Sequence, residues 1–188
     1  MTRRHAAADS ATRRLRQALR HSARLDWPAA HAAILAGAPI DTAMGQVWFG
    51  ATPLIAATSS GCTTEAGWLL NHGADTNARN RNGWTALMTV NLRFGAESAK
   101  DLIATLLDHG ADPSQKAPDG RTLPEIFVST HRKDMLPILD RALAGPQRAE
   151  ARQRLLTQLT IEQRTAWLPK SSAVETAMTT RTVWRRLP

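Results

Sequence analysis

The chain has 188 residues, of which 43% are hydrophobic, and it carries a formal net charge of +8. This length and composition are enough for one folded domain and argue against wholesale disorder. A single cysteine, Cys62, excludes an intrachain disulfide and a thiolate metal cage, and no apolar run reaches the roughly 18 residues of a membrane-spanning helix.

The positive charge lies at the two ends of the chain. Residues 1–24 contain seven Arg and one Asp, and residues 146–188 contain eight basic and three acidic side chains. Residues 25–145 are mildly acidic, with nine basic and twelve acidic side chains. A nucleic acid or an anionic membrane surface would therefore be bound through the termini.

The Arg-rich start of the chain has two interpretations. Residues 1–24 resemble a mitochondrial targeting peptide, because they are rich in Arg and nearly free of acidic residues. A cationic amphipathic helix in a bacterial protein explains the same pattern and is favoured, since 20 of the 24 basic residues in the chain are Arg and Ala is abundant. We therefore expect a basic N-terminal arm over residues 1–11 and a cytoplasmic location.

Two sequence patterns recur along the middle of the chain. The pattern Gly-x-Thr occurs at Gly50–Thr52, Gly83–Thr85 and Gly120–Thr122, so the unit recurs every 33 to 37 residues. The pattern Leu-Leu-x-His-Gly-Ala-Asp occurs at residues 69–75 and 106–112. Repetition at this period is typical of an array of stacked repeats.

Each unit predicts two short helices and a projecting turn. Thr52 is a good N-cap and Pro53 suits the first helical position, so a helix is expected to about Ser59. A second helix is expected over residues 64–72, and the polar residues 74–82 predict a hairpin-like finger. Helices this short are not stable alone, so at least three units have to stack.

These residues resemble the ankyrin repeat family, through Gly73-Ala-Asp-x-Asn77 followed by Gly83-x-Thr-x-Leu87. The resemblance implies an all-α solenoid of helix-turn-helix units joined by fingers, with extra helices at the C-terminal end. The expected divisions are an ankyrin repeat domain over 12–143, with units at 12–41, 50–77, 83–114 and 120–143, then capping helices over 146–168 and a basic tail over 169–188.

The repeats depart from the family pattern in three places. The third unit has about four extra residues between its helices, within residues 90–101. The fourth unit reads Thr122-Leu123-Pro124, with leucine and proline transposed, and its Pro137 interrupts a helical run. The finger after the first unit is longer and more apolar, over residues 44–49.

Residues that could carry chemistry are better explained by the repeat. His72 and His109 occupy equivalent positions in the last turn of a helix, where a His also favours the negative end of the helix dipole. Cys62 has no nearby base or orienting group and is expected to be a packed small residue. Motifs for phosphate binding, metal binding or paired-carboxylate catalysis are absent, so we expect no catalytic residue, cofactor or metal.

The finger and helix start of the third unit are the first candidate for partner binding. The resemblance places Trp84 on the ligand-facing side, with Arg121 in the same slot one unit along, and Arg79, Arg81 and Asn82 lie on the adjoining finger. Trp and Arg are enriched at binding hot spots. Two interpretations stay open: a recognition strip, or a Trp folded over a finger beside solvated arginines.

The long finger is the second candidate. Trp48 and Phe49 are interpreted either as exposed anchors for a partner or as a cover over the weak first unit, which is favoured. Trp68, beside two leucines on the second helix, is expected in the core.

The C-terminal region also has an apolar helical pattern. Its stripe over residues 146–168 is expected to pack on the last repeat, and the tail is polar and basic with little to bury. Residues 183–187 are either a docking peptide, a phosphate-contacting end or a frayed terminus, and the last is the default.

The function expected from these patterns is a non-enzymatic protein–protein interaction module that binds a partner protein through the concave face and fingers. An adaptor, an inhibitor and an effector delivered into a host cell are all consistent with the composition, and a monomer is expected. The alternative is electrostatic binding of a nucleic acid or an anionic membrane surface through the Arg-rich termini.

Overall fold

The computed structural model describes residues 2–20, 25–90, 95–144 and 149–158, and within these ranges all regular elements are helical. The elements are α1 (Thr2–Ala18), α2 (Trp27–Leu35), the 3-10 helix η1 (Gln46–Trp48), α3 (Pro53–Ser59), α4 (Thr63–Asn71), α5 (Ala86–Thr89), α6 (Ala96–Asp108), α7 (Leu123–Ser129), α8 (Met135–Leu143) and α9 (Ala149–Gln158).

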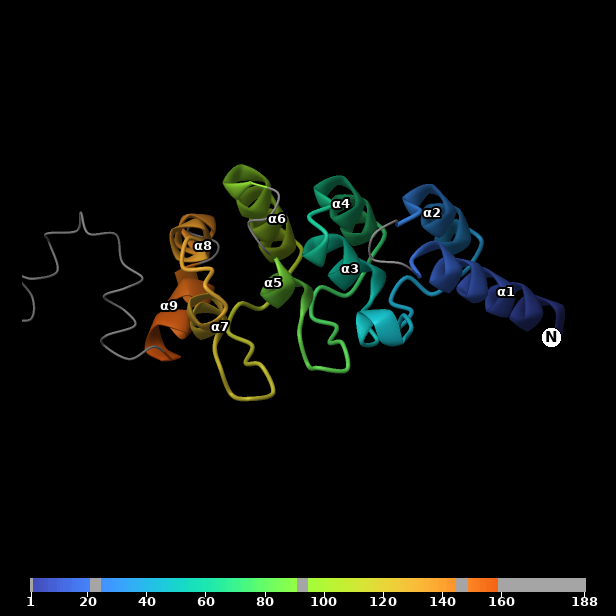
Figure 1. The fold of residues 1–188 in the computed structure, drawn as a ribbon. Coiled ribbons are helices and arrows are strands. Elements are labelled where there is room, and N and C mark those ends of the chain that lie inside the picture. Colours follow the sequence, from blue (N-terminus) through green and yellow to red (C-terminus); the bar gives the residue numbers. More distant parts are fainter. Residues whose placement is uncertain (1, 21–24, 91–94, 145–148, 159–188) are drawn as a thin grey trace, which may run out of the picture.

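The helices stack in two rows. The even-numbered helices α2, α4, α6 and α8 follow one another along one side, and α1, α3, α5 and α7 lie along the other (Figure 1). Each odd-numbered helix packs on the even-numbered helix that follows it, and α4, α6 and α8 pack in succession. The segment with η1 and two long loops project from the odd-numbered row (Figure 1). The predicted all-α array of paired helices with fingers is confirmed.

The local signals in the sequence explain the helix boundaries. The Thr52 hydroxyl accepts a hydrogen bond from the Ile55 amide at 3.3 Å, and Pro53 is the first residue of α3. Gly73 follows the end of α4 with a φ of +85°, a conformation that glycine adopts without steric cost. The predicted limits of this helix pair agree with the observed ones to within a residue.

The core runs without interruption through the stack. Its largest fully buried side chains recur along the chain, most of them in successive helices: Leu15, Leu19, Met44, Leu54, Leu69, Leu87, Met88, Ile103, Leu106, Leu123, Ile126 and Phe127. Burying one such side chain contributes about 1.5–3 kcal/mol. Since each pair of helices exposes an apolar side to the next pair, the stability of one unit depends on its neighbours.

The third unit has a very short first helix. Helix α5 covers only Ala86–Thr89, and the Thr85 side chain makes no capping hydrogen bond. The guanidinium of Arg132, which comes from the loop between α7 and α8, donates to the carbonyl oxygens of Val90 and of Met88. The fourth unit therefore holds the end of α5, where helical carbonyls have no partner within the helix. The extra residues that the sequence places after α5 lie largely outside the described residues.

The fourth unit accommodates both of its prolines. Glu125 accepts hydrogen bonds from the amide and the hydroxyl of Thr122, at 2.7 and 2.8 Å, and this closes the start of α7. Pro124 lies in the first turn of α7, and Pro137 lies in the first turn of α8. A first-turn proline costs no helical hydrogen bond, so Pro137 does not interrupt α8.

Successive fingers are tied to one another by hydrogen bonds that recur along the stack. The carboxylate of Asp41 accepts from the Asp75 amide at 3.1 Å, and burial raises the pKa of Asp41. One unit further on, the Asn77 carboxamide accepts from the Asp112 amide at 2.9 Å and donates to the Gly110 carbonyl at 3.0 Å. The repeated spacing in the sequence therefore corresponds to hydrogen bonds between fingers that recur at equivalent positions.

Trp68 corrects one expectation, because it is only partly buried. Its indole is stacked between the rings of His31 at 3.9 Å and His72 at 3.8 Å. Trp68 lies on the flank of α4 that faces α2, so it joins two neighbouring units at the edge of the core.

The two ends of the described stack are helical. Helix α1 runs without a break through residues 11 and 12, where the basic arm was expected to end. At the other end, α9 packs on α8, and Arg152 pairs with Asp140 at 2.8 Å. The rest of the expected capping region and the whole tail, with residues 183–187, lie outside the described residues.

Candidate functional site

The finger before Trp84 is closed by the side chain of Asn80. The Asn80 carboxamide oxygen accepts from the amides of Asn82 and Trp84, both at 3.0 Å, and the Asn80 amide donates to the Trp84 carbonyl at 3.0 Å. This turn fixes the backbone of Trp84, and its indole is half-buried against the core. Only part of the Trp84 ring is therefore exposed to solvent.

Two arginines of the expected strip are engaged within the protein. Arg79 donates to the carbonyls of Gly83 at 2.7 Å and Lys116 at 3.0 Å, so it links neighbouring fingers. Arg121 pairs with Asp119 at 2.6 Å, and this bond lowers the pKa of the Asp119 carboxyl. The Arg79 guanidinium therefore joins two fingers, and the Arg121 guanidinium is paired with a carboxylate two residues before it.

Two exposed residues of the expected strip, Arg81 and Asn82, lie next to Phe49 of the long finger, and we call these three residues the Phe49 patch. Phe49 is 59% exposed and has a φ of +50°, and its carbonyl accepts from the Arg81 amide at 2.8 Å. Arg81 and Asn82 are exposed. The structure thus brings the tip of the long finger next to the finger of the following unit.

Trp48 and Phe49 separate, although they are neighbours in sequence. The Trp48 indole N–H donates to the Leu19 carbonyl at 2.7 Å, and its ring is half-buried against the core. Trp48 therefore covers the end of α1, whereas Phe49 projects. The left-handed backbone at Phe49 turns the two side chains apart.

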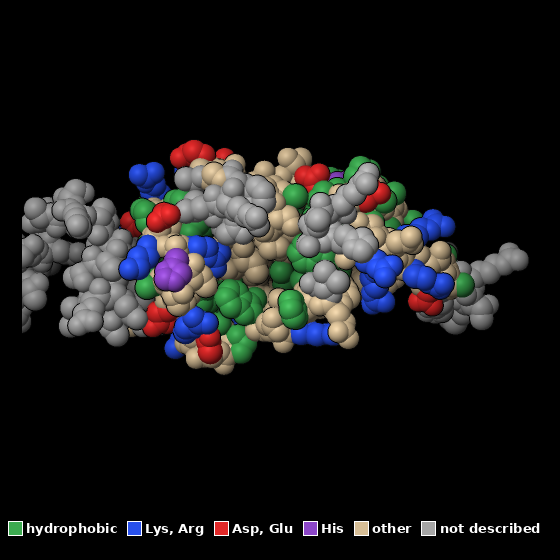
Figure 2. All heavy atoms as spheres, viewed as in Figure 1, with side chains coloured by type: hydrophobic (Ala, Val, Ile, Leu, Met, Phe, Trp, Pro, Cys, Tyr) green, Lys and Arg blue, Asp and Glu red, His purple; other side chains and the backbone are tan. Residues whose placement is uncertain are grey.

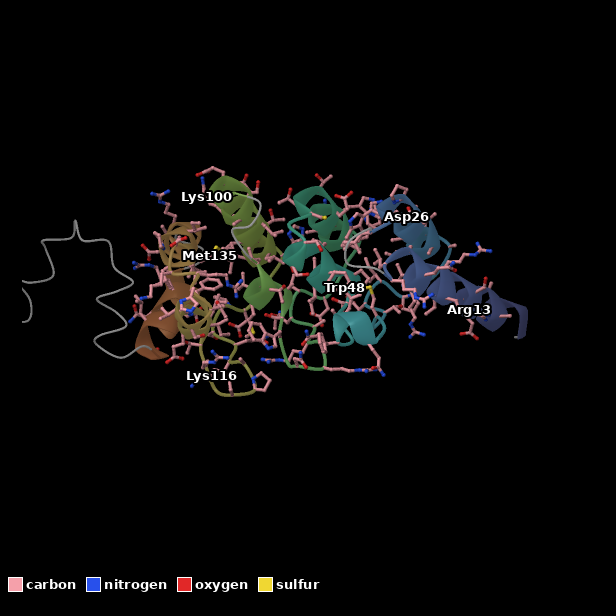
Figure 3. The ribbon with its side chains drawn as sticks, viewed as in Figure 1. Arg13, Asp26, Trp48, Lys100, Lys116 and Met135 are labelled. Atoms are coloured by element: carbon pink, nitrogen blue, oxygen red, sulfur yellow. The ribbon has the colours of Figure 1, made fainter. Side chains whose placement is uncertain are left out.

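A basic hollow of about 480 Å³ lies between α1 and the segment that contains η1. We call it the arginine hollow; its lining residues are Arg13, Arg16, Gln17, Arg20, Gly45, Gln46 and Trp48. Figure 3 shows Arg13 on α1 and Trp48 on the neighbouring segment, and basic side chains gather at this end of the visible face in Figure 2. Sequence reasoning treated the basic N-terminal region as a whole and did not find this hollow. Part of the signal is local, because Arg13 and Arg16 lie on one side of α1 and Arg20 follows at the same helical spacing just beyond its end.

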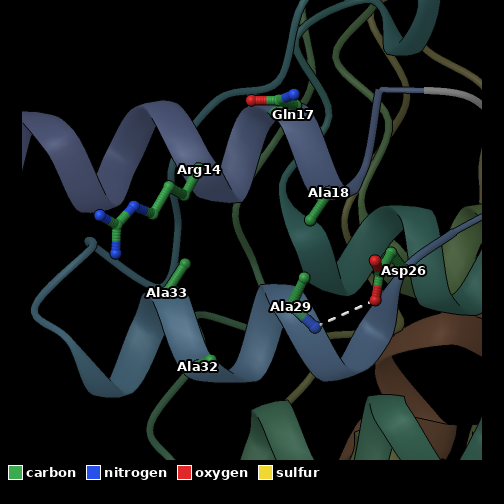
Figure 4. Close-up of a pocket in the computed structure, with 7 residues that line it drawn as sticks. All are labelled: Arg14, Gln17, Ala18, Asp26, Ala29, Ala32 and Ala33. Carbon is green, nitrogen blue, oxygen red and sulfur yellow. Dashed lines mark hydrogen bonds between the residues drawn. The ribbon is translucent and has the colours of Figure 1, made fainter.

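A second hollow, of about 590 Å³, lies between α1 and α2. It is lined mainly by alanines, with Arg14 and Asp26 at opposite ends (Figure 4). Asp26 already accepts from the Ala29 amide at 3.1 Å as the N-cap of α2. The arrangement offers no convergent polar groups for a ligand.

The histidines and the cysteine lie where the repeat places them. The Nδ1 atoms of His72 and His109 each lie 2.8 Å from the carbonyl oxygen four residues earlier, at the ends of α4 and α6. Burial raises the pKa of the Cys62 thiol, which disfavours the thiolate needed for nucleophilic chemistry. Among the described residues, no three His, Cys, Asp or Glu side chains come together as a metal site.

The comparisons with known proteins agree with this architecture. The model for ankyrin repeats in three copies matches residues 5–117, which is more than half of the chain. No curated protein sequence matches the chain. In the part that the structure describes, no helix has both the length and the apolar character to cross a membrane. Ankyrin repeats are in general protein–protein interaction modules and are typically not enzymes. The chain belongs to the ankyrin repeat family.

Proposed function

We propose that this protein is a non-enzymatic adaptor, inhibitor or effector that binds one partner protein through the finger side of its stack, with the Phe49 patch at the centre of the contact. The single observation that carries the proposal is a large aromatic side chain, 59% exposed, at the tip of a finger whose backbone is bonded to the next finger. Aromatic residues held in place in this way are typical anchors of protein interfaces.

Rigidity of the fingers supports the same proposal. Asn77 and Arg79 tie their finger to the following one through side-chain bonds to backbone atoms. A surface that is already ordered loses little conformational entropy when a partner binds, so more of the contact energy appears as affinity. The engaged Arg79 and Arg121 act here as supports of the surface, and Trp84 contributes the exposed part of its ring.

The test compares two exposed apolar side chains on opposite sides of the stack. Phe49→Asn removes the aromatic ring but keeps a residue that tolerates the left-handed backbone. Leu35→Ala, at the end of α2, removes an even more exposed side chain and serves as the control. Immobilised protein is used to capture partners from a lysate of the source cells, and the captured proteins are quantified by mass spectrometry. A partner lost with Phe49→Asn and kept with Leu35→Ala supports the proposal, whereas equal capture by both variants contradicts it.

A further inference from the structure

The arginine hollow has walls that the protein holds in place. The Trp48 indole bonds to the Leu19 carbonyl at 2.7 Å, and the Arg16 Nε donates to the Ala43 carbonyl at 3.3 Å. The backbone of the turn is closed by bonds from Trp48 to Gly45 and from Met44 to Ala51. These bonds join the C-terminal end of α1 to the turn, so contacts within the protein hold the two walls of the hollow together.

The positive charge in the hollow is not neutralised within the described residues. Arg13, Arg16 and Arg20 are exposed, none of them pairs with a described carboxylate, and the lining contains no acidic side chain. Arg121 differs, because its guanidinium pairs with the Asp119 carboxylate, whereas the one bond that described residues make to the three guanidiniums of the hollow joins Arg16 Nε to a neutral carbonyl. Unpaired guanidiniums around a preformed hollow indicate a site for an anionic ligand.

The spacing of the arginines limits the size of that ligand. Arg13 and Arg20 are seven positions apart, and the amides of Leu19 and Arg20 continue the helical hydrogen bonding just beyond α1, so the span is about 10 Å. The cluster can therefore reach about two or three oxyanions. Nucleic-acid binding through so few phosphate contacts would have only a shallow dependence on salt concentration. Gln17 and Gln46 add amide groups that can bond the backbone of a peptide.

We propose that the arginine hollow binds a short acidic segment of the partner protein, whose side-chain oxyanions pair with Arg13, Arg16 and Arg20. The guanidinium fork binds planar oxyanions through two parallel hydrogen bonds, and carboxylates and phosphoryl groups share this chemistry. The proposal rests on the proposed function, because α1 belongs to the same row as α3, α5 and α7 (Figure 1). Gly45, Gln46 and Trp48 of the long finger line the hollow. The inference adds that the part of the partner in contact with the N-terminal end of that surface is acidic.

The test uses fluorescein-labelled octapeptides and fluorescence anisotropy on the full chain at physiological salt. One peptide has Glu at alternate positions, a second has phosphoserine there, a third has Gln, and an octathymidine strand replaces the peptide in a fourth arm. Binding of the Glu or the phosphoserine peptide, and not of the Gln peptide, is expected, and the stronger of the two identifies the source of the oxyanion. Octathymidine that binds as tightly as both acidic peptides would overturn the assignment to a peptide.

Matched variants distinguish binding in the arginine hollow from nonspecific attraction to the positively charged protein. Arg13→Gln/Arg20→Gln is expected to weaken binding about tenfold. Arg14→Gln/Arg141→Gln removes the same charge from exposed positions outside the hollow and is expected to change binding less than twofold. Equal losses in the two double variants would refute the site. Arg13→Lys/Arg20→Lys keeps the positive charge but removes the bidentate guanidinium groups, so its affinity is expected to lie between those of the wild type and the Gln variant. This variant provides the test if the Gln variant does not fold.

Partner capture distinguishes this inference from the proposed function. If Phe49→Asn loses the partner while Arg13→Gln/Arg20→Gln retains it fully, the hollow is not part of the interface and the proposed function stands. If capture depends on neither set of residues, both proposals fail.

Discussion

Gly83 offers a quantitative test of how the fingers pack. Its φ is +73°, and a Cβ atom at this position would lie 2.1 Å from the Cγ and 2.8 Å from the Cδ of Pro118 on the next finger. Gly73 has a similar φ of +85°, but a Cβ there would have no neighbour within 4 Å. The two glycines therefore differ in the contact between fingers and not in backbone conformation.

The difference between the two substitutions measures the contact. Gly73→Ala is expected to lower the free energy of unfolding by about 1–2 kcal/mol, which is the cost of a left-handed alanine. Gly83→Ala adds a clash with a rigid ring and is expected to cost about 1–3 kcal/mol more. Urea denaturation followed by circular dichroism gives both values.

A second substitution identifies the source of that extra cost. Pro118→Ala removes Cγ and Cδ, and the remaining Cβ would lie 3.5 Å from the new methyl group, an ordinary contact. Adding Pro118→Ala to Gly83→Ala should therefore recover about 1–3 kcal/mol, seen as a coupling energy in the double-mutant cycle. Equal costs for Gly73→Ala and Gly83→Ala, or a coupling near zero, would refute the packing of these two fingers.

Three further predictions follow from single contacts. Arg132→Met removes the donor to the carbonyls at the end of α5 and is expected to lower the free energy of unfolding, measured in urea, by about 1–3 kcal/mol. The control Lys133→Ala, at an exposed neighbouring position, should change it by less than about 0.5 kcal/mol. Similar values for the two variants would mean that the guanidinium does not hold α5. Thr52→Ala removes the hydroxyl that caps α3 and is expected to lower the free energy of unfolding by about 1 kcal/mol. Thr85→Ala is expected to lower it less, because the Thr85 hydroxyl makes no capping bond, so the Thr52 variant should have the lower melting temperature. A lower melting temperature for the Thr85 variant would contradict this. Because burial raises the pKa of the Cys62 thiol, iodoacetamide at neutral pH should alkylate the folded chain more slowly than the chain in urea, and the folded rate should rise as alkaline pH generates the thiolate. Identical rates in the folded and the unfolded chain would contradict the raised pKa.

The helix pairs could be predicted from the sequence because their signals are local. Thr52, Pro53 and Gly73 act within one or two turns of the backbone, so their spacing alone determines where α3 and α4 begin and end. The repetition of this spacing then implies stacking, since neither helix buries its apolar side alone. The shortness of α5 was not predictable in the same way, because its end is held by Arg132 from another unit.

The candidate site was harder to predict, because it depends on which side chains form hydrogen bonds or ion pairs within the protein and which stay exposed. The sequence places Arg79 and Arg81 on one finger and Arg121 in the slot of Trp84 one unit along, but it does not show that contacts across fingers engage Arg79 or that a nearby carboxylate engages Arg121. Trp48 and Phe49 look alike in sequence and separate through a single left-handed residue. The spacing of Arg13, Arg16 and Arg20 is a local signal for a basic helix face, but the arginine hollow also needs the long finger beside α1, and that tertiary arrangement cannot be predicted from the spacing.

The most direct test of the proposed interface is photo-crosslinking at single positions in living source cells. Benzoylphenylalanine in place of Phe49 is expected to yield a discrete crosslinked partner, and the same group in place of Leu35, on the row of even-numbered helices, is expected to yield none. A partner crosslinked from position 35 and not from position 49 would place the interface on the opposite side of the stack and contradict the account.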